Sequence, residues 1–186
     1  MKKIFFAPIF TLLFFAFSSC ETQDSLDPRP LIVDGQYVRL DITKKVLTSD
    51  HLDTAVFGGA LTTPGNNVQS YDLYVRRHNV NDVITGNYVK LLTITSFPTE
   101  LAITPQMIAD ALSIPRSDLL AGDVFTFLGY SKGFDGTIVD YNKLSATVKA
   151  QAGMKQGYKF MTKLASDTSI NNEQLNLYFN NYQLGL

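Results

Sequence analysis

Apolar and polar side chains alternate along most of the chain after residue 37. Near the start of this region Val38, Leu40 and Ile42 interleave with Arg39 and Asp41. A period of two is typical of a β-strand that buries one face and exposes the other. The same kind of pattern predicts strands over residues 38–42, 55–61, 71–75, 88–95, 124–130 and 158–164.

Two of these segments, 88–95 and 124–130, are denser in apolar residues than strict alternation requires. Such density fits either a central strand that is covered on both faces or a local bulge. Between the predicted strands lie Gly, Pro, Asn and Asp residues, which adopt the backbone conformations that tight turns need. We therefore expect hairpins at residues 63–67, 79–86 and 135–136.

One segment breaks the alternation and predicts a short helix near residues 104–114. Thr104 is a favourable N-cap residue, Pro105 suits the first helical position, and Pro115 ends the run. The apolar stripe of this helix consists of Met107, Ile108, Ala111 and Leu112.

Several short strands with a single helix indicate a mostly-β fold, an antiparallel Greek-key sandwich of immunoglobulin or fibronectin type III character. We expect this domain to span residues 37–166, with the helix crossing between the strands named E and F in such domains. A chain of this size buries about 70% of its unfolded surface and needs no metal or disulfide to be stable. Beyond it, residues 167–186 contain Leu175, Leu177 and Phe179 in alternation, which predicts an edge strand or an ordered tail.

The first 19 residues have the features of a targeting segment. Lys2 and Lys3 precede an apolar run from Ile4 to Phe17, as in a secretory signal peptide. The run is shorter than the roughly 20 apolar residues that a membrane-spanning helix needs.

The residues that follow, Phe17-Ser18-Ser19-Cys20, resemble the lipobox of bacterial lipoproteins. That resemblance implies cleavage after residue 19 and fatty acylation of Cys20, the single cysteine of the chain. Two or three acyl chains hold a protein stably on a bilayer, whereas one holds it only marginally. The alternative is an ordinary secretory signal with a chance cysteine at its end.

Residues 20–36 form a polar linker with prolines at positions 28 and 30, which favour an extended course. Glu21, Asp24 and Asp27 resemble the export signal that sends Bacteroidota-type lipoproteins to the outer cell surface. The alternative is that these acids belong to a linker that is simply polar.

The chain as a whole resembles small Bacteroidota-type surface lipoproteins with an immunoglobulin-like domain. The resemblance rests on Cys20 and on the segments 35–40, 70–75, 122–127 and 158–160. It implies an outer-membrane, lipid-anchored protein, an accessory to a starch-utilisation-type uptake system in which it captures a ligand or assists assembly. It carries over no catalytic residue.

The composition of the chain argues against several other classes of function. The chain has 16 basic and 17 acidic side chains, a formal charge of -1, so it lacks the basic field of a nucleic-acid-binding protein. One cysteine and two histidines disfavour disulfides and zinc sites. His51 beside Asp50 and Asp53, and His78 near Asn81 and Asp82, are weak metal candidates, and we expect neither metal nor cofactor.

Residues Gly129-Tyr130-Ser131-Lys132-Gly133 match the G-x-S-x-G motif of serine hydrolases. That motif needs a strand-to-helix turn at the serine and a histidine further along the chain. Both histidines precede Ser131, and turn-forming residues 135–136 follow it. We therefore expect a hairpin corner at this point and a protein that is not an enzyme.

Binding is the favoured class of function. Saccharides are recognised by aromatic faces beside amides or carboxylates, and our principal candidates are Tyr74, Tyr130, Phe134 and Tyr141, with Tyr37 and Tyr88 in a wider set. The expected partners are a membrane, through the acyl anchor, and a polysaccharide. The alternative is a structural lipoprotein that binds a protein partner by edge-strand pairing through residues 175–179.

Overall fold

The computed structural model describes residues 35–81, 83–151, 153 and 156–166. The described residues all belong to one compact unit. The expectations for the signal segment, Cys20, most of the linker and the C-terminal residues 167–186 lie outside the described residues.

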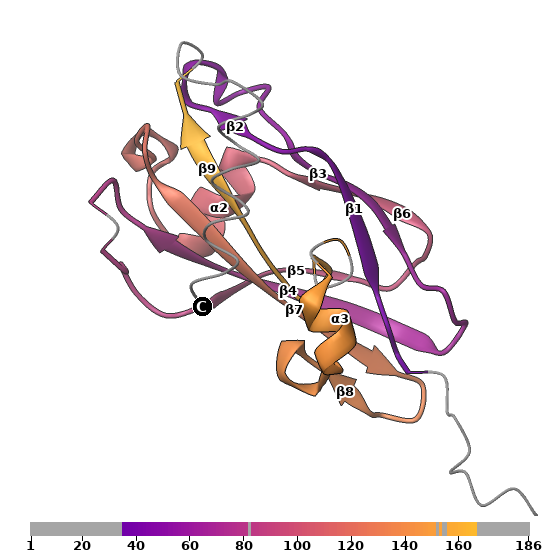
Figure 1. Ribbon diagram of the computed structural model, residues 1–186. Coiled ribbons are helices and arrows are strands. Elements are labelled where there is room, and N and C mark those ends of the chain that lie inside the picture. The colour runs from indigo at the N-terminus through magenta and orange to yellow at the C-terminus, as the bar shows by residue number, and fades with distance from the viewer. Residues whose placement is uncertain (1–34, 82, 152, 154–155, 167–186) are drawn as a thin grey trace, which may run out of the picture. The chain divides into compact units, whose positions relative to one another are not determined.

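The smaller of two sheets has three antiparallel strands in the order β1-β3-β6 (Figure 1). These are β1 (Arg39–Lys44), β3 (Phe57–Thr62) and β6 (Thr99–Ile103). In β3, a Cβ on Gly58 would overlap the carbonyl oxygen of Leu101 on β6. The backbones of β3 and β6 therefore approach closely only because residue 58 is glycine.

The larger sheet has the strand order β2-β9-β7-β4-β5, and β8 pairs with β7 at its side. Only β2 runs parallel to its neighbour β9; the other pairings are antiparallel. The strands are β2 (Leu47–Thr48), β4 (Val68–His78), β5 (Val89–Ile94), β7 (Val124–Gly133), β8 (Ile138–Val139) and β9 (Lys159–Ala165).

Aromatic side chains pack between the two sheets. Phe57 of the smaller sheet stacks on Phe127 and Phe160 of the larger one, with ring centroids 5.8 and 5.9 Å apart. Phe127 and Phe160 stack on each other at 4.8 Å. Since these rings are nearly or completely buried, the two sheets share one apolar core, which confirms the prediction of a mostly-β fold with two packed sheets.

The predicted helix is confirmed as α2 (Pro105–Leu112). The Thr104 hydroxyl accepts a hydrogen bond from the Met107 N–H at 3.2 Å, and Ser113 ends the helix in a left-handed conformation. The helix connects β6 of the smaller sheet to β7 of the larger one and packs against β5 and β4. A second short helix, α3 (Ala146–Ala150), was not predicted.

Of the two alternatives for the segment 88–95, the structure bears out the local bulge: β5 ends the sheet, and the pairing shifts register opposite Leu73 and Tyr74, which accounts for the extra apolar residue. Other details of the strand prediction are wrong. Residues 63–67 do not form a hairpin, because they lead from β3 in one sheet to β4 in the other. Strand β6 was missed although Leu101 and Ile103 alternate with polar or small neighbours. Strand β7 continues to Gly133, past the expected corner at residues 129–133.

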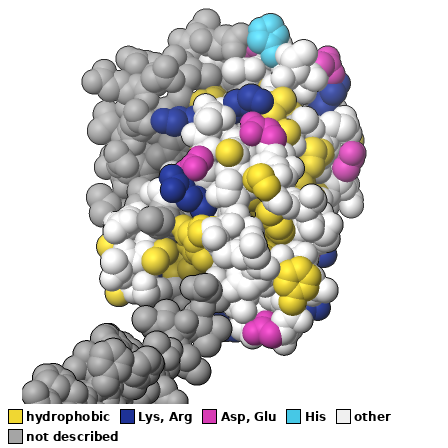
Figure 2. Space-filling view, turned by 90° about the vertical axis from the view of Figure 1, so that its right-hand side faces the viewer, with side chains coloured by type: hydrophobic (Ala, Val, Ile, Leu, Met, Phe, Trp, Pro, Cys, Tyr) yellow, Lys and Arg dark blue, Asp and Glu magenta, His cyan; other side chains and the backbone are white. Residues whose placement is uncertain are grey.

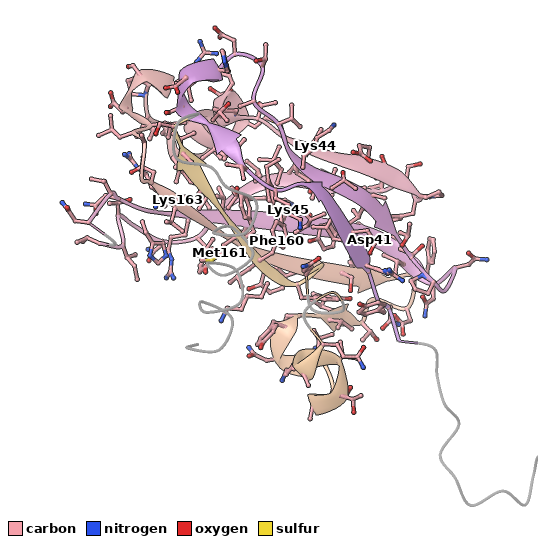
Figure 3. The ribbon with its side chains drawn as sticks, turned by 45° about the horizontal axis from the view of Figure 1, so that its top comes forward. Asp41, Lys44, Lys45, Phe160, Met161 and Lys163 are labelled. Atoms are coloured by element: carbon pink, nitrogen blue, oxygen red, sulfur yellow. The ribbon has the colours of Figure 1, made fainter. Side chains whose placement is uncertain are left out.

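Strands β1 and β9 lie along the same side of the two sheets. In Figure 3 Asp41 and Lys44 mark β1, whereas Phe160, Met161 and Lys163 mark β9. The Thr162 hydroxyl of β9 donates to the Lys45 carbonyl at 3.1 Å, just after β1. The chain then continues into β2, which joins the larger sheet, so its first strands divide between the two sheets.

Charged side chains of both signs are interspersed among apolar ones on the face shown in Figure 2. This agrees with the near balance of basic and acidic residues in the whole chain. Two exposed pairs are Arg39 with Asp41 at 2.9 Å and Lys44 with Glu100 at 3.8 Å. Such exposed pairs contribute little to stability.

Candidate functional site

A pocket of about 220 Å³ lies against the larger sheet, beside β7. In β4, Tyr71, Leu73 and Val75 are buried in the core, so Tyr74 between them belongs to the opposite, outward face. Leu128 and Tyr130 of β7 pair with Tyr74 and Asp72 and share that outward face. The pocket is lined by Tyr88, Leu128, Gly129, Tyr130, Asp140, Tyr141, Asn142, Tyr158 and Lys159.

Two lining tyrosines, Tyr88 and Tyr130, lie on the sheet side of this pocket, and Tyr74 packs against Tyr130 outside the lining. The rings of Tyr74 and Tyr130 are 5.3 Å apart at an angle of 78°, an edge-to-face contact that fixes both rings. Tyr88 immediately precedes β5, and its hydroxyl donates to the Thr126 hydroxyl oxygen at 3.2 Å. The Arg76 guanidinium lies over the Tyr88 ring, 4.4 Å from its centroid.

The fourth tyrosine, Tyr141, opens the short 3₁₀ turn Tyr141–Lys143 that follows β8. The Asp140 carboxylate caps this turn by accepting from the N–H groups of Asn142 and Lys143 at 3.0 and 3.1 Å. The cap holds Asp140, Tyr141 and Asn142 in a defined arrangement at the pocket wall. This side of the pocket is therefore formed by a short local segment, a turn that Asp140 stabilises.

The tyrosine hydroxyls sit close enough to influence one another. Burial raises the pKa of Tyr130, and the Asp140 carboxylate and the hydroxyls of Tyr74 and Tyr88 raise it further. Tyr130 is therefore protonated at neutral pH and able to donate a hydrogen bond. Together with the Asn142 amide and the Asp140 carboxylate, the pocket offers both donors and acceptors around aromatic rings.

Two lysine ammonium groups lie by the Tyr141 ring. The Nζ atoms of Lys149 and Lys159 are 5.4 and 5.2 Å from its centroid. Lys149 also donates to the Asn142 carbonyl at 2.9 Å, which anchors α3 to the turn. Cation–π contact of this kind positions a long side chain that would otherwise be mobile.

The structure brings together three of the four principal candidate residues, Tyr74, Tyr130 and Tyr141, with Tyr88 of the wider set. Phe134 is elsewhere: it lies in the turn after β7, 71% exposed and outside the pocket lining. Tyr37 also lies outside the lining and packs on Tyr158 with ring centroids 5.9 Å apart.

Three polar lining residues were missed from the sequence, Asp140, Asn142 and Lys159, as was Arg76, which lies over the ring of Tyr88. One signal was available for two of them. Asp140-Tyr141-Asn142 places an acid, an aromatic ring and an amide in consecutive positions of a loop, a combination typical of saccharide sites.

Ser131 of the G-x-S-x-G match is fully buried inside strand β7. Its hydroxyl donates to the Gln36 carbonyl and lies 3.0 Å from the Tyr158 hydroxyl. A strand-interior serine without a strand-to-helix turn lacks the geometry of a nucleophile elbow. Here the Ser131 hydroxyl connects β7 by a hydrogen bond to Gln36, at the start of the domain.

Neither histidine belongs to a metal cluster in the described ranges, where no group of three or more His, Cys, Asp or Glu side chains could hold a metal ion. His78 is 5% exposed at the end of β4, and its Nε2 is 3.5 Å from the Thr126 hydroxyl. His51 lies in the 3₁₀ turn Ser49–His51.

None of the helices in the described part of the chain has the length and apolar character required to span a membrane. Comparison of the chain with protein-family models, with curated proteins and with solved structures finds no match.

Proposed function

We propose that this protein is a lipid-anchored, non-catalytic saccharide-capture protein of the outer membrane, accessory to a nutrient-uptake system. The observation that carries the proposal is the convergence of Tyr88, Tyr130 and Tyr141 in the lining of one pocket, with Tyr74 packed edge-to-face against Tyr130. These residues come from separate stretches of the chain and meet only through the fold. Tyr74 and Tyr130 lie on the outward face of the larger sheet, where core packing does not explain them, whereas Tyr141 also packs against the core.

The dimensions and chemistry of the pocket support a sugar ligand. A volume of about 220 Å³ corresponds to about seven waters at about 30 Å³ each, enough for one monosaccharide unit of a longer chain. Aromatic rings contact the C–H faces of a sugar, while hydroxyl, amide and carboxylate groups bind its hydroxyls. Tyr130, Asn142 and Asp140 supply those three kinds of polar group.

The proposed lipid anchor is supported by the sequence of residues 1–20. A basic start, an apolar run and the Phe17-Ser18-Ser19-Cys20 segment favour an acylated Cys20 at the new N-terminus. An acylated protein with a polar linker would hold the pocket near a membrane while leaving it accessible to polymers. Residues Glu21, Asp24 and Asp27 favour the cell surface over the periplasm.

We further propose that the sandwich is immunoglobulin-like. Strands β9, β7, β4 and β5 would correspond to G, F, C and C′, and β1, β3 and β6 to A, B and E. The division of the first strand between both sheets, with β2 parallel to β9, supports this assignment. The helix α2 then lies between E and F, the connection expected from the sequence.

Affinity electrophoresis of the full chain in detergent, through gels that contain single polysaccharides, tests the proposal. We expect retardation by at least one polysaccharide and loss of retardation in Tyr130→Ala, with about tenfold or greater weakening for a central aromatic contact. Phe134→Ala is the matched control, because it removes an exposed aromatic ring that lies outside the pocket.

Equal retardation of the Tyr130→Ala and Phe134→Ala variants would exclude the pocket as the binding site. Absence of retardation by every polysaccharide, together with recovery of a protein partner that is lost on deletion of residues 168–186, would favour the assembly alternative instead.

A further inference from the structure

Two exposed apolar side chains lie on the hairpin that joins β7 to β8. Phe134 is 71% exposed, the highest value among the large apolar side chains that are exposed in the described residues, and Ile138 is 49% exposed. Neither side chain belongs to the buried core. Neither lines the pocket that contains Tyr88, Tyr130 and Tyr141, the tyrosine pocket. Core packing and the pocket therefore do not account for these two side chains.

Hydrogen bonds fix the shape of this hairpin. The Gly133 N–H donates to the Thr137 carbonyl at 2.8 Å, and the Gly136 N–H donates to the Gly133 carbonyl at 3.0 Å. The Asp135 carboxylate accepts from the N–H and the hydroxyl of Thr137, both at 2.9 Å. Gly136 has a φ of 82°, a conformation that glycine adopts without strain. The hairpin therefore presents Phe134 to solvent on a well-defined turn.

The same hairpin lies where the chain enters the domain. The Gln36 side-chain amide donates to the Asp135 carboxylate, with its Nε2 atom 3.3 Å from each carboxylate oxygen. The Ser131 hydroxyl donates to the Gln36 carbonyl. In Figure 1 the β7–β8 hairpin and the start of β1 lie at the same end of the domain. The chain that carries Cys20 therefore joins the domain beside Phe134.

From this arrangement we infer that the tip of the hairpin docks on the lipid bilayer, with Phe134 and Ile138 inserted at its surface. The inference rests on the proposed acyl anchor at Cys20 and adds a second contact with the same membrane. Aromatic and aliphatic side chains favour the interface between lipid and water. A short tether keeps the domain at an effective concentration of about millimolar near the bilayer, so even a small apolar contact would be occupied.

The opposite end of the domain carries a second group of exposed apolar side chains, Val80, Val83, Ile84 and Leu120. Strand β4 separates the two ends, because Phe134 follows the end of β7 that pairs with Val68, whereas Val80 lies beyond the last residue of β4. The 11 residues of β4 span about 37 Å.

The length of the tether argues against docking through that second group. Residues 21–34 span at most about 50 Å when fully extended. A bilayer contact at Val80 would require the tether to run back along the domain and to use most of that length. Contact through Phe134 leaves the tether most of its conformational freedom, and the end that carries the hairpin is therefore the favoured one.

Tryptophan fluorescence tests the inference, because the chain contains no tryptophan. The protein, extracted with detergent from the membranes of its producing cell, is reconstituted into phosphatidylcholine vesicles with or without bromine on the acyl chains, which quenches a nearby tryptophan. Phe134→Trp should lose about half or more of its emission in brominated vesicles, since interfacial side chains reach about 5–10 Å into the bilayer. Val83→Trp, 56% exposed at the opposite end, is the matched control and should keep its emission.

A second pair of variants examines the role of Phe134 itself. Ile138→Trp reports on the hairpin while Phe134 is present, and it should also be quenched in brominated vesicles. Adding Phe134→Ser should reduce that quenching by about half or more, because it removes the larger of the two apolar side chains.

Flotation of the vesicles in a density gradient distinguishes the two proposals. Protein that floats with the vesicles while Phe134→Trp and Ile138→Trp stay unquenched overturns the inference and leaves the acyl anchor in place. Equal quenching of Val83→Trp and Phe134→Trp also overturns it, since the tryptophan itself would then be drawn to the lipid. Protein that carries no acyl group and does not float counts against the proposed anchor and overturns the inference with it.

Discussion

The hydroxyl of Tyr158, just before β9, holds the start of the domain in place, and its removal gives a sharp prediction. The Tyr158 hydroxyl donates to the Gln36 carbonyl at 2.9 Å and accepts from the Val38 N–H at 3.0 Å. The Ser131 hydroxyl donates to the same Gln36 carbonyl. Val38 and Tyr158 are fully buried, so water cannot replace these bonds.

The substitution Tyr158→Phe leaves the Val38 N–H buried without an acceptor, which costs about 1–3 kcal/mol. The Gln36 carbonyl keeps the hydrogen bond from Ser131. In contrast, Ser131→Ala leaves no group unpaired, because Tyr158 still donates to Gln36, so it should cost about 0.5–1.5 kcal/mol. The double variant also deprives the Gln36 carbonyl of its last donor and should lose more than the sum of the two.

Urea unfolding followed by circular dichroism measures these differences as free energies of unfolding. The suitable protein lacks residues 1–19 and carries Cys20→Ser, which keeps lipid out of the assay. A loss of about 2 kcal/mol would lower Tm by about 4–8 °C in a domain of this size. Tyr74→Phe is the control, since no hydrogen bond of its hydroxyl is present among the described residues.

Two results would refute this reasoning. A cost for Tyr158→Phe within about 0.5 kcal/mol of zero, the range of ordinary surface substitutions, would mean that the Val38 N–H needs no such acceptor. A larger cost for Ser131→Ala than for Tyr158→Phe would mean that the serine, rather than the tyrosine, holds the start of the domain.

Three further predictions concern stability. Asp123→Ala removes the buried partner of Arg77, whose guanidinium is 2.7 Å away, and should cost about 3–5 kcal/mol in urea unfolding because a mostly buried cation loses its counter-charge. Gly129→Ala should cost about 1–3 kcal/mol, since its Cβ would overlap the Gly157 carbonyl and the Tyr71 hydroxyl, whereas Gly35→Ala has open space and should be neutral. Burial raises the pKa of Tyr71 in the folded state, so its contribution to stability is present below the ordinary tyrosine pKa of about 10 and is lost as pH rises above that value. A series of thermal melts from about pH 8 to about pH 11 should therefore show Tm falling with pH, less steeply in Tyr71→Phe than in the unsubstituted protein. An equal slope in both proteins would contradict this.

The strands and the helix were largely readable from the sequence because each depends on a local pattern. Alternation located β1, β4, β7 and β9, and the Thr104-Pro105 start with Pro115 beyond it located α2. The predictions that were wrong concerned which strands pair with each other. Alternation shows which side chains share a face, but it does not show that β3 and β4 belong to different sheets or that β5 ends one.

Part of the arrangement around the pocket was predictable for the same reason. An outward tyrosine can be recognised from its place in a strand, and Tyr74 and Tyr130 do lie on the outward face of the larger sheet. Their approach to Tyr88 and Tyr141 depends on strand order and on a turn after β8 that Asp140 caps. Phe134 was nominated for its aromatic ring alone, and its turn places it outside that lining.

The most direct test of saccharide capture is an NMR titration of the full chain in detergent, labelled with ¹⁵N at its nine tyrosines, with oligomers of a polysaccharide that retards the protein in affinity electrophoresis as the ligand. If the tyrosine pocket binds saccharides, the signals of Tyr88, Tyr130 and Tyr141 shift together with one saturation curve, while that of Tyr37 stays in place. Saturation that moves Tyr37 and leaves those three unchanged, or no change in any tyrosine signal, would contradict the account.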